Sequence, residues 1–72
     1  MKIEYFPETD SLYIDLAERP GCDTVEIGDG MVLDIDAEGH PVGLDIDQAS
    51  KHLDLRSLNL KRIPFDIQQG AI

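Results

Sequence analysis

Alternation between apolar and polar side chains restricts the fold of this chain more than any other feature of its sequence. In residues 31–36 apolar side chains occupy all the odd positions, with Val32 as the one apolar residue at an even position, and in residues 42–47 they occupy the even positions. Successive side chains of a strand point to opposite faces, so this pattern predicts strands with one buried and one solvated face. Shorter runs of the same kind, at residues 3–5, 12–16 and 24–27, predict three more strands.

The hydrophobic pattern also predicts a register for the last hairpin. Because residues of one face must pair with each other, Ile35 should lie opposite Val42, and Asp34 opposite Gly43. This register leaves a two-residue turn at residues 38–39, with the glycine at positive φ. Gly43 offers no side chain, so another chain segment or a β-bulge is expected to approach the backbone there.

The periodicity changes at Asp47, which is a suitable N-cap. Ala49 and Leu53 follow with a spacing of four, which predicts a helix over about residues 48–53. A helix of two turns is marginal alone and must dock on the sheet. Alternation then resumes in residues 55–67 around a proline, which predicts an extended segment at an edge position or a turn.

These elements together predict an α+β fold, a small antiparallel β-meander of about five strands with a short C-terminal helix and an extended tail. Residues 1–54 form the single domain, and residues 55–72 form an apolar tail that docks on the sheet or on a second subunit. A chain of 72 residues is near the lower limit for independent folding, and Cys22 alone cannot form an internal disulfide. One short helix cannot cover five strands, so a homodimer is the expected state. The apolar positions of the tail are Leu58, Leu60, Ile63, Phe65 and Ile67.

The charge of the chain restricts its partners. There are 15 Asp and Glu against 6 Lys and Arg, a net charge of −9, so neither nucleic acid nor an anionic membrane is expected to bind. A charged partner should be basic. Residues 51–72 differ from the rest, because they carry four bases and two acids. No apolar run approaches the roughly 20 residues that span a bilayer, and a cytoplasmic location is expected.

Three motifs occur in a fixed order along the first two thirds of the chain. The motifs occupy residues 10–16, 33–39 and 42–50. This combination resembles the prokaryotic family known as Domain of Unknown Function 2283, which carries an Asp-x-Leu-Tyr-Ile strand, an Asp-x-Asp-x-Asp-Gly hairpin and a Val-Gly-Ile-Glu-Ile-x-x-Ala-Ser exit into a helix. The resemblance covers residues 3–54, with Glu38 in place of the usual Asp and Asp45 in place of the usual Glu. It implies a small α+β domain without an assigned catalytic residue. Some members are encoded beside small toxin-like proteins, which points to a protein partner.

Four acids, Asp34, Asp36, Glu38 and Asp45, fall at positions 1, 3, 5 and 12 of a segment with glycine at position 6, the spacing of an EF-hand calcium loop. The flanks of an EF-hand loop are helices, whereas both flanks here alternate with period two. Position 12 also carries the shorter Asp, and a proline interrupts the segment. We therefore expect solvated acids on the polar face of a hairpin. A divalent-cation (calcium) binding domain that uses the 34–45 hairpin remains the alternative.

No catalytic, cofactor-binding or metal-binding residue is predicted. Asp34 and Asp45 would be diagonal neighbours, but an acid/base pair needs a pocket that one small sheet does not readily form. Ser50 and His52 are two residues apart on the predicted helix, where their side chains diverge. Cys22 is expected to be an ordinary loop thiol. A hydrolase whose site forms only between subunits is a third hypothesis.

The preferred function is a non-enzymatic interaction module that offers an acidic sheet face to a basic protein, in an antitoxin-like pairing. Three apolar side chains, Phe6, Tyr13 and Val32, are predicted on the face opposite the main apolar stripe. They are either scattered surface residues or part of a dimer contact.

Overall fold

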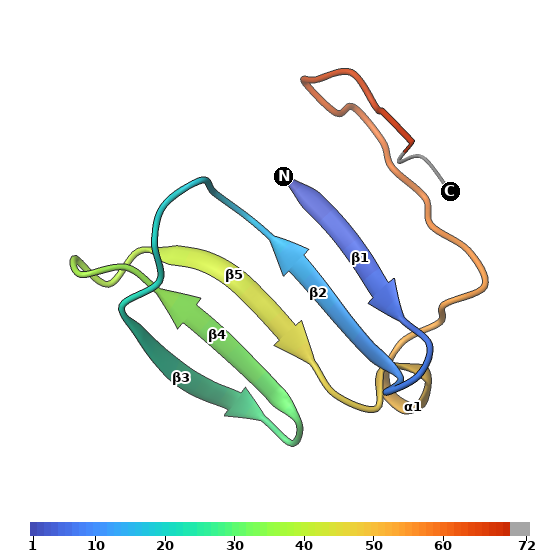
Figure 1. Ribbon diagram of the computed structural model, residues 1–72. Helices are drawn as coiled ribbons and strands as arrows, with labels where there is room; N and C mark the ends of the chain where they lie inside the picture. Colours follow the sequence, from blue (N-terminus) through green and yellow to red (C-terminus); the bar gives the residue numbers. More distant parts are fainter. Residues whose placement is uncertain (70–72) are drawn as a thin grey trace.

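Five strands in one antiparallel sheet and one short helix make up the computed structural model, which describes residues 1–69 (Figure 1). The elements are β1 (Lys2–Phe6), β2 (Ser11–Asp15), β3 (Asp23–Gly28), β4 (Met31–Ile35), β5 (Pro41–Ile46) and α1 (Ala49–His52). The predicted α+β architecture is therefore confirmed, and each strand overlaps the segment where the alternation predicted one, with bounds that differ by one residue at most ends.

The strands lie in the order β1-β2-β5-β4-β3, so the sheet departs from the chain order at one place. Three of the four neighbouring pairs are hairpins between consecutive strands, whereas β2 pairs with β5. Figure 1 shows how this arises: after β2, residues 16–22 pass the ends of β5 and β4 and deliver β3 to the far edge. Strands that are distant in the sequence therefore meet at the centre of the sheet.

The register of the β4–β5 hairpin agrees with the prediction at its centre and differs near its turn. Asp34 lies opposite Gly43 as predicted, but Ile35 lies opposite Pro41 and not opposite Val42. A β-bulge separates the two regions and leaves Val42 as the extra residue, with 4% of its surface exposed. Proline cannot donate to the hydrogen-bond ladder, and a bulge is one of the few places where a strand accepts it.

The turn of this hairpin is longer than the predicted two residues. The Asp36 amide donates to the His40 carbonyl at 2.9 Å, and the Gly39 amide donates to the Asp36 carbonyl at 3.0 Å, so residues 37–39 form a three-residue loop. Gly39 has a φ of 85°, which confirms the prediction of a positive φ. A three-residue hairpin loop typically needs a left-handed residue at its last position, and glycine adopts that conformation without strain.

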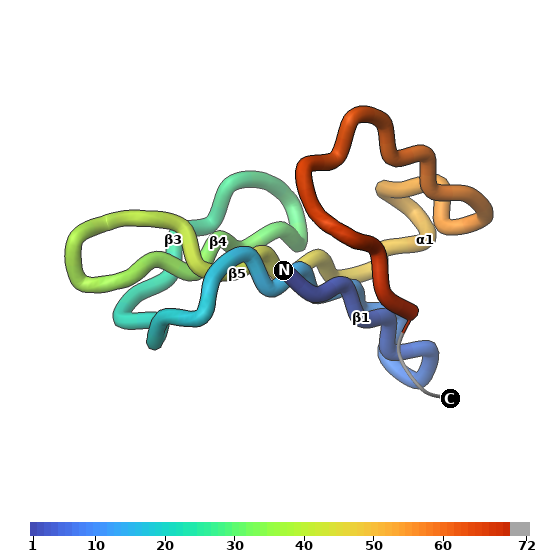
Figure 2. Tube along the Cα trace, turned by 90° about the horizontal axis from the view of Figure 1, so that it is seen from above, coloured from blue at the N-terminus to red at the C-terminus, as the bar shows by residue number. Residues whose placement is uncertain are grey.

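One face of the sheet, the inner face, carries the apolar stripe. The cross-strand pairs Leu12–Ile46 and Leu33–Leu44 lie on it. Fully buried hydrophobic residues are few in the described chain: Val42, Ile46 and Ala49. Figure 2 shows the reason, because α1 and the tail lie at the β1 end of the molecule, away from β3. The inner face is thus covered at one end and open at the other.

Helix α1 is shorter than predicted, and Asp47 does not cap it. Gln48 occupies the N-cap position in a left-handed conformation, with a φ of 49° and no side-chain cap. The cap comes from the β1–β2 turn, where the Asp10 carbonyl accepts a hydrogen bond from the Ala49 amide at 2.8 Å. The Asp10 carboxylate accepts two more from Ser50, from its amide at 3.2 Å and its hydroxyl at 2.6 Å. A residue distant in the sequence has therefore replaced the local cap.

After α1 the chain runs on without a helix or strand up to residue 69, with turns or bends at residues 55–56, 62 and 64–65. Its apolar side chains are largely exposed, to 69% at Leu58, 52% at Phe65 and 64% at Ile67. The last three residues of the predicted 55–72 tail lie outside the described residues. Among residues 1–69, no helix is long and apolar enough to cross a membrane.

Candidate functional site

The face of the sheet opposite the apolar stripe carries two rows of side chains that run across the strands. The first row is Glu4, Tyr13, Asp45, Val32 and Glu26, and the second is Lys2, Asp15, Gly43, Asp34 and Thr24. We call this surface the acidic face, after its five carboxylates: Glu4, Asp15, Glu26, Asp34 and Asp45. Lys2 is the one cation in the two rows, and it pairs with Glu4 at 3.5 Å. The register of the strands thus places these five carboxylates on one face of the sheet.

Tyr13 lies at the centre of this surface, over Gly43. A Cβ at position 43 would overlap the Tyr13 hydroxyl, so glycine leaves the space that the phenol ring occupies. The hydroxyl donates a hydrogen bond to the Asp34 carboxylate at 3.2 Å. Partial burial raises the pKa of Tyr13, and the bond to Asp34 and the charges of Asp15 and Asp45 raise it further. Tyr13 is therefore a protonated donor at neutral pH. The chain segment that was expected to approach the backbone of Gly43 is the side chain of Tyr13.

Asp45 is a carboxylate of the acidic face whose charge no cation of the two rows compensates. Loss of solvent raises the pKa of its carboxyl group, although the residue remains exposed, and the neighbouring Asp47 and Asp34 raise that pKa further. Like charges across and along a sheet repel one another, and no cation of the two rows pairs with Asp45. A positive group placed over this part of the acidic face would relieve the repulsion.

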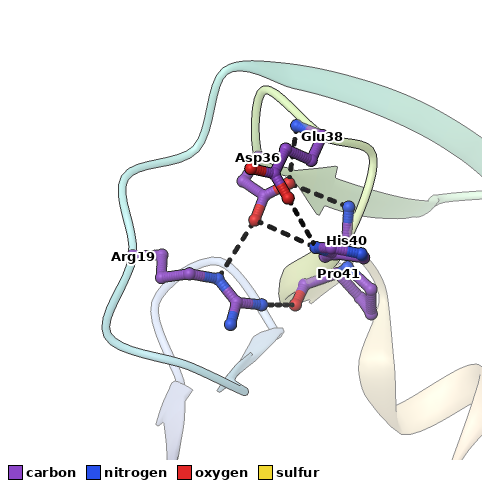
Figure 3. Close-up of polar contacts among 5 residues, drawn as sticks. All are labelled: Arg19, Asp36, Glu38, His40 and Pro41. Atoms are coloured by element: carbon purple, nitrogen blue, oxygen red, sulfur yellow. Dashed lines mark hydrogen bonds and ion pairs between the residues drawn. The ribbon is translucent and has the colours of Figure 1, made fainter.

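Asp36, the second acid of the calcium-like spacing, takes part in hydrogen bonds and ion pairs with other residues of the chain (Figure 3). Its carboxylate accepts hydrogen bonds from the amides of Glu38 and His40, both at 2.9 Å. The Arg19 guanidinium pairs with the same carboxylate at 3.1 Å and donates to the Pro41 carbonyl at 3.2 Å. The His40 amide lowers the pKa of Asp36 most, followed by the Glu38 amide and the charges of His40 and Arg19.

The structure divides the four acids of the predicted cation site between two places. Asp34 and Asp45 lie on the acidic face, while Asp36 and Glu38 belong to the turn at the end of the hairpin. The β-bulge after Asp34 separates the two pairs. In residues 1–69 no group of three or more His, Cys, Asp or Glu side chains is placed to hold a metal ion. The geometry gives no support to the calcium alternative.

The remaining reactive side chains do not assemble with one another. Ser50 donates its hydroxyl to Asp10 and lies two residues from His52 on α1, where the two side chains were expected to diverge. Cys22 is exposed and lines a shallow depression of about 610 Å³ beside the Arg19–Asp36 pair.

Asp10, Arg19 and the role of Tyr13 escaped the sequence analysis. Ser50, the partner of Asp10, is 40 residues away, and Asp36, the partner of Arg19, is on the other side of two strands, so no local spacing reveals either contact. Tyr13 did carry a signal. It is an aromatic residue at a polar position of an alternating strand, opposite a strand with a glycine in its interior.

Comparison with known families gives one match, to the model described as Protein of unknown function (DUF2283), over residues 2–50. The matched segment includes all five strands and the first two residues of α1. Neither curated proteins nor solved structures give a significant match. The resemblance carried by the three motifs is thereby confirmed, and the chain belongs to the DUF2283 family of proteins of unknown function.

Proposed function

We propose that this protein is a non-enzymatic interaction module whose acidic face binds a basic protein. The observation that carries the proposal is the pair of rows across the sheet, in which five carboxylates surround Tyr13 and a single lysine opposes them. A broad sheet surface suits a protein partner better than a small ligand, which needs a concave site. Carboxylates on such a surface attract a basic partner and orient it before contact.

The chemistry of the centre supports binding as well as attraction. Tyrosine is among the residues that contribute most to protein interfaces, because it buries a large ring and keeps a hydrogen-bonding group. Tyr13 is held by Gly43 below it and Asp34 beside it, so little conformational freedom would be lost on binding. An arginine or lysine of the partner near Asp45 would offset the repulsion from Asp34 and Asp47.

In an antitoxin-like pairing, the acidic face would cover a basic functional surface of a toxin-like partner. Blocking of this kind requires only tight binding, so it needs no catalytic residue in this chain. Because the attraction is between charges, we expect the affinity to fall as the salt concentration rises.

The proposal is tested by affinity purification from the native host at low salt, with identification of the bound protein by mass spectrometry. The binding-face variant carries Asp15→Asn, Asp34→Asn and Asp45→Asn. The matched control removes the same charge from exposed turns and loops, with Glu8→Gln, Glu18→Gln and Asp29→Asn. We expect a basic protein to be retained by the wild type and the control and lost from the binding-face variant. Equal retention by both variants, or a partner without a basic surface, would contradict the proposal.

A further inference from the structure

The chain exposes more surface than a compact protein of its mass. Its accessible surface is 6093 Å², whereas a compact monomer of 8.0 kDa exposes about 4,500 Å² by the scaling of surface with mass. The excess of about 1,600 Å² is roughly twice the area, about 800 Å² per partner, that a stable protein interface buries. A single copy therefore leaves enough surface uncovered for an interface with another chain.

Large apolar side chains are exposed in two places. On the sheet, β1 exposes 50% of Ile3 and β3 exposes 44% of Val25, both on the inner face, where they pair with Ile14 and Leu33. Beyond α1, the tail exposes a second set of apolar side chains: Leu55, Leu58, Leu60, Phe65 and Ile67. Exposed apolar surface on this scale typically marks an interface.

The tail covers the inner face of its own sheet only at the β1 end. Residues 53–58 border an open groove of about 600 Å³ that is otherwise lined by Ile3, Tyr5, Leu12 and Ile14 of β1 and β2. Figure 2 shows the rest of the described tail at the β1 end, away from β3. The groove is thus open while most of the apolar side chains of the tail remain exposed.

We propose that a second copy of this chain fills the inner face, and that residues 55–67 of each copy lie on the inner face of the other. Charge favours this arrangement over direct contact between two sheets. The first 50 residues carry 13 acids and two bases, so two sheets repel each other, whereas residues 51–72 have two bases in excess. Exchange of the tails brings the basic segment of each copy to the acidic domain of its partner.

This inference is independent of the proposed function, because it uses the opposite side of the sheet. In such a dimer both acidic faces point outward, and each remains free. The dimer therefore has two equivalent acidic faces.

The experiment measures the mass of the full chain by light scattering at increasing concentration. We expect twice 8.0 kDa for the wild type. The tail variant Leu58→Asp/Ile67→Asp and the sheet variant Val25→Asp should each return to a single-chain mass at the same concentration. The matched control is Phe6→Asp, which adds the same charge at a residue that is 40% exposed but lies on the acidic face, and it should stay dimeric.

The place of the tail is tested by spin labelling. A Cys22→Ser/Phe65→Cys chain carries the label and is mixed with an unlabelled, ¹⁵N-enriched wild-type chain. Tail exchange predicts a loss of amide signals in β3 of the unlabelled chain. A doubled mass without this loss overturns the exchange of tails, and a single-chain mass at millimolar concentration overturns the dimer. Leu58 and Ile67 are largely exposed in one copy, so their variant tests the proposal even if Val25→Asp does not fold.

Discussion

At the scale of single residues, Asp10 connects more of the structure than any other side chain described above. Its carboxylate accepts hydrogen bonds from the Tyr5 hydroxyl at 2.8 Å and from both donors of Ser50, and its carbonyl accepts the Ala49 amide. The bond from the Ser50 hydroxyl lowers the pKa of Asp10 most, and the bond from Tyr5 lowers it further. One residue therefore joins β1, the following turn and α1.

We expect Asp10→Asn to lower Tm by several degrees and to speed hydrogen exchange of the Ser50 amide. Asp10 has a φ of 53°, which asparagine also tolerates, so the backbone is not strained by the change. What is lost is an ionised acceptor shared by Tyr5 and Ser50. Calorimetry measures the stability, and Ser50→Ala in the Asp10→Asn background serves as the control. If the losses of stability caused by Asp10→Asn and by Ser50→Ala simply add, the two residues do not act through a shared contact.

Removal of the Asp45 carboxylate is expected to have the opposite effect on stability. Its raised pKa means that the folded protein binds the proton more tightly than the unfolded chain does. The contribution of Asp45 to stability is therefore complete below the pKa that it has in the unfolded chain, and it is lost as the pH rises through the pKa that it has in the folded protein. We expect Asp45→Asn to raise Tm at pH 7 by a few degrees and to have little effect at pH 3. Thermal melts at both pH values measure this, and a lower Tm at pH 7 would contradict it.

Asp10 and Asp36 determine how the stability of the fold changes at low pH. Their lowered pKa values mean that the unfolded chain binds protons more tightly, so their contribution is complete above the ordinary value of 3.8 and is lost as the pH falls through the folded pKa. Together with Asp45, this predicts a stability maximum on the acidic side of neutrality. A pH series of melts checks it, and a Tm that rises steadily from pH 5 to pH 8 would count against it.

At the scale of elements, the β4–β5 hairpin depends on Gly39. No atom lies within 4 Å of the place where a side chain at this position would begin, so a substitution meets no steric obstacle except its own backbone. We expect Gly39→Val to destabilise the fold by about 1–3 kcal/mol, because a β-branched residue is strained at positive φ. Denaturant unfolding measures the change. Gly39→Asn is the matched control and should cost less, and equal losses would show that backbone conformation is not the cause.

The features that could be predicted from the sequence are those that depend on residues close together along the chain. Alternation located all five strands and placed Asp34 opposite Gly43. It did not predict the bulge at Val42, because that bulge follows from a turn one residue longer than the pattern required and from a proline at the start of β5. The cation-site spacing failed because β4 ends at Ile35, so Asp36 lies in the turn, where its carboxylate accepts the amides of Glu38 and His40.

The elements that sequence analysis missed depend on contacts between distant segments. Asp47 is a residue type that caps helices, but the N-cap position falls on the left-handed Gln48, and the Asp10 carbonyl accepts the Ala49 amide there. The pairing of β2 with β5 is likewise invisible to alternation, which assigns residues to faces and does not choose neighbours. The acidic face itself was predictable, whereas the position of Tyr13 over Gly43 required that pairing.

At the scale of the whole molecule, a net charge of −9 on a small sheet predicts a salt-dependent stability. We expect moderate NaCl to raise Tm by screening the repulsion among carboxylates, and CaCl₂ at equal ionic strength to raise it by a similar amount. Melts in the two salts make the comparison. A site specific for calcium would add about 2.7 kcal/mol at a hundredfold excess over Kd, which screening does not imitate.

The control for this experiment is the variant Asp34→Asn/Asp36→Asn, which removes two of the four acids with the calcium-like spacing. Screening predicts that NaCl and CaCl₂ still act alike on it. A large rise with calcium alone in the wild type, abolished in this variant, would restore the 34–45 segment as a cation site.

The strand order β1-β2-β5-β4-β3 has a consequence for how the chain folds. The β1–β2 hairpin and the β3–β4–β5 unit each form from consecutive strands, and their union requires the chain between Asp15 and Pro41 to close on itself. The entropy lost on closure grows with the length of the loop, so we expect this pairing to be the slow step of folding. Asp10 and Ser50 belong to opposite sides of that union. We therefore expect the turn of helix α1 to form only after the two parts have met.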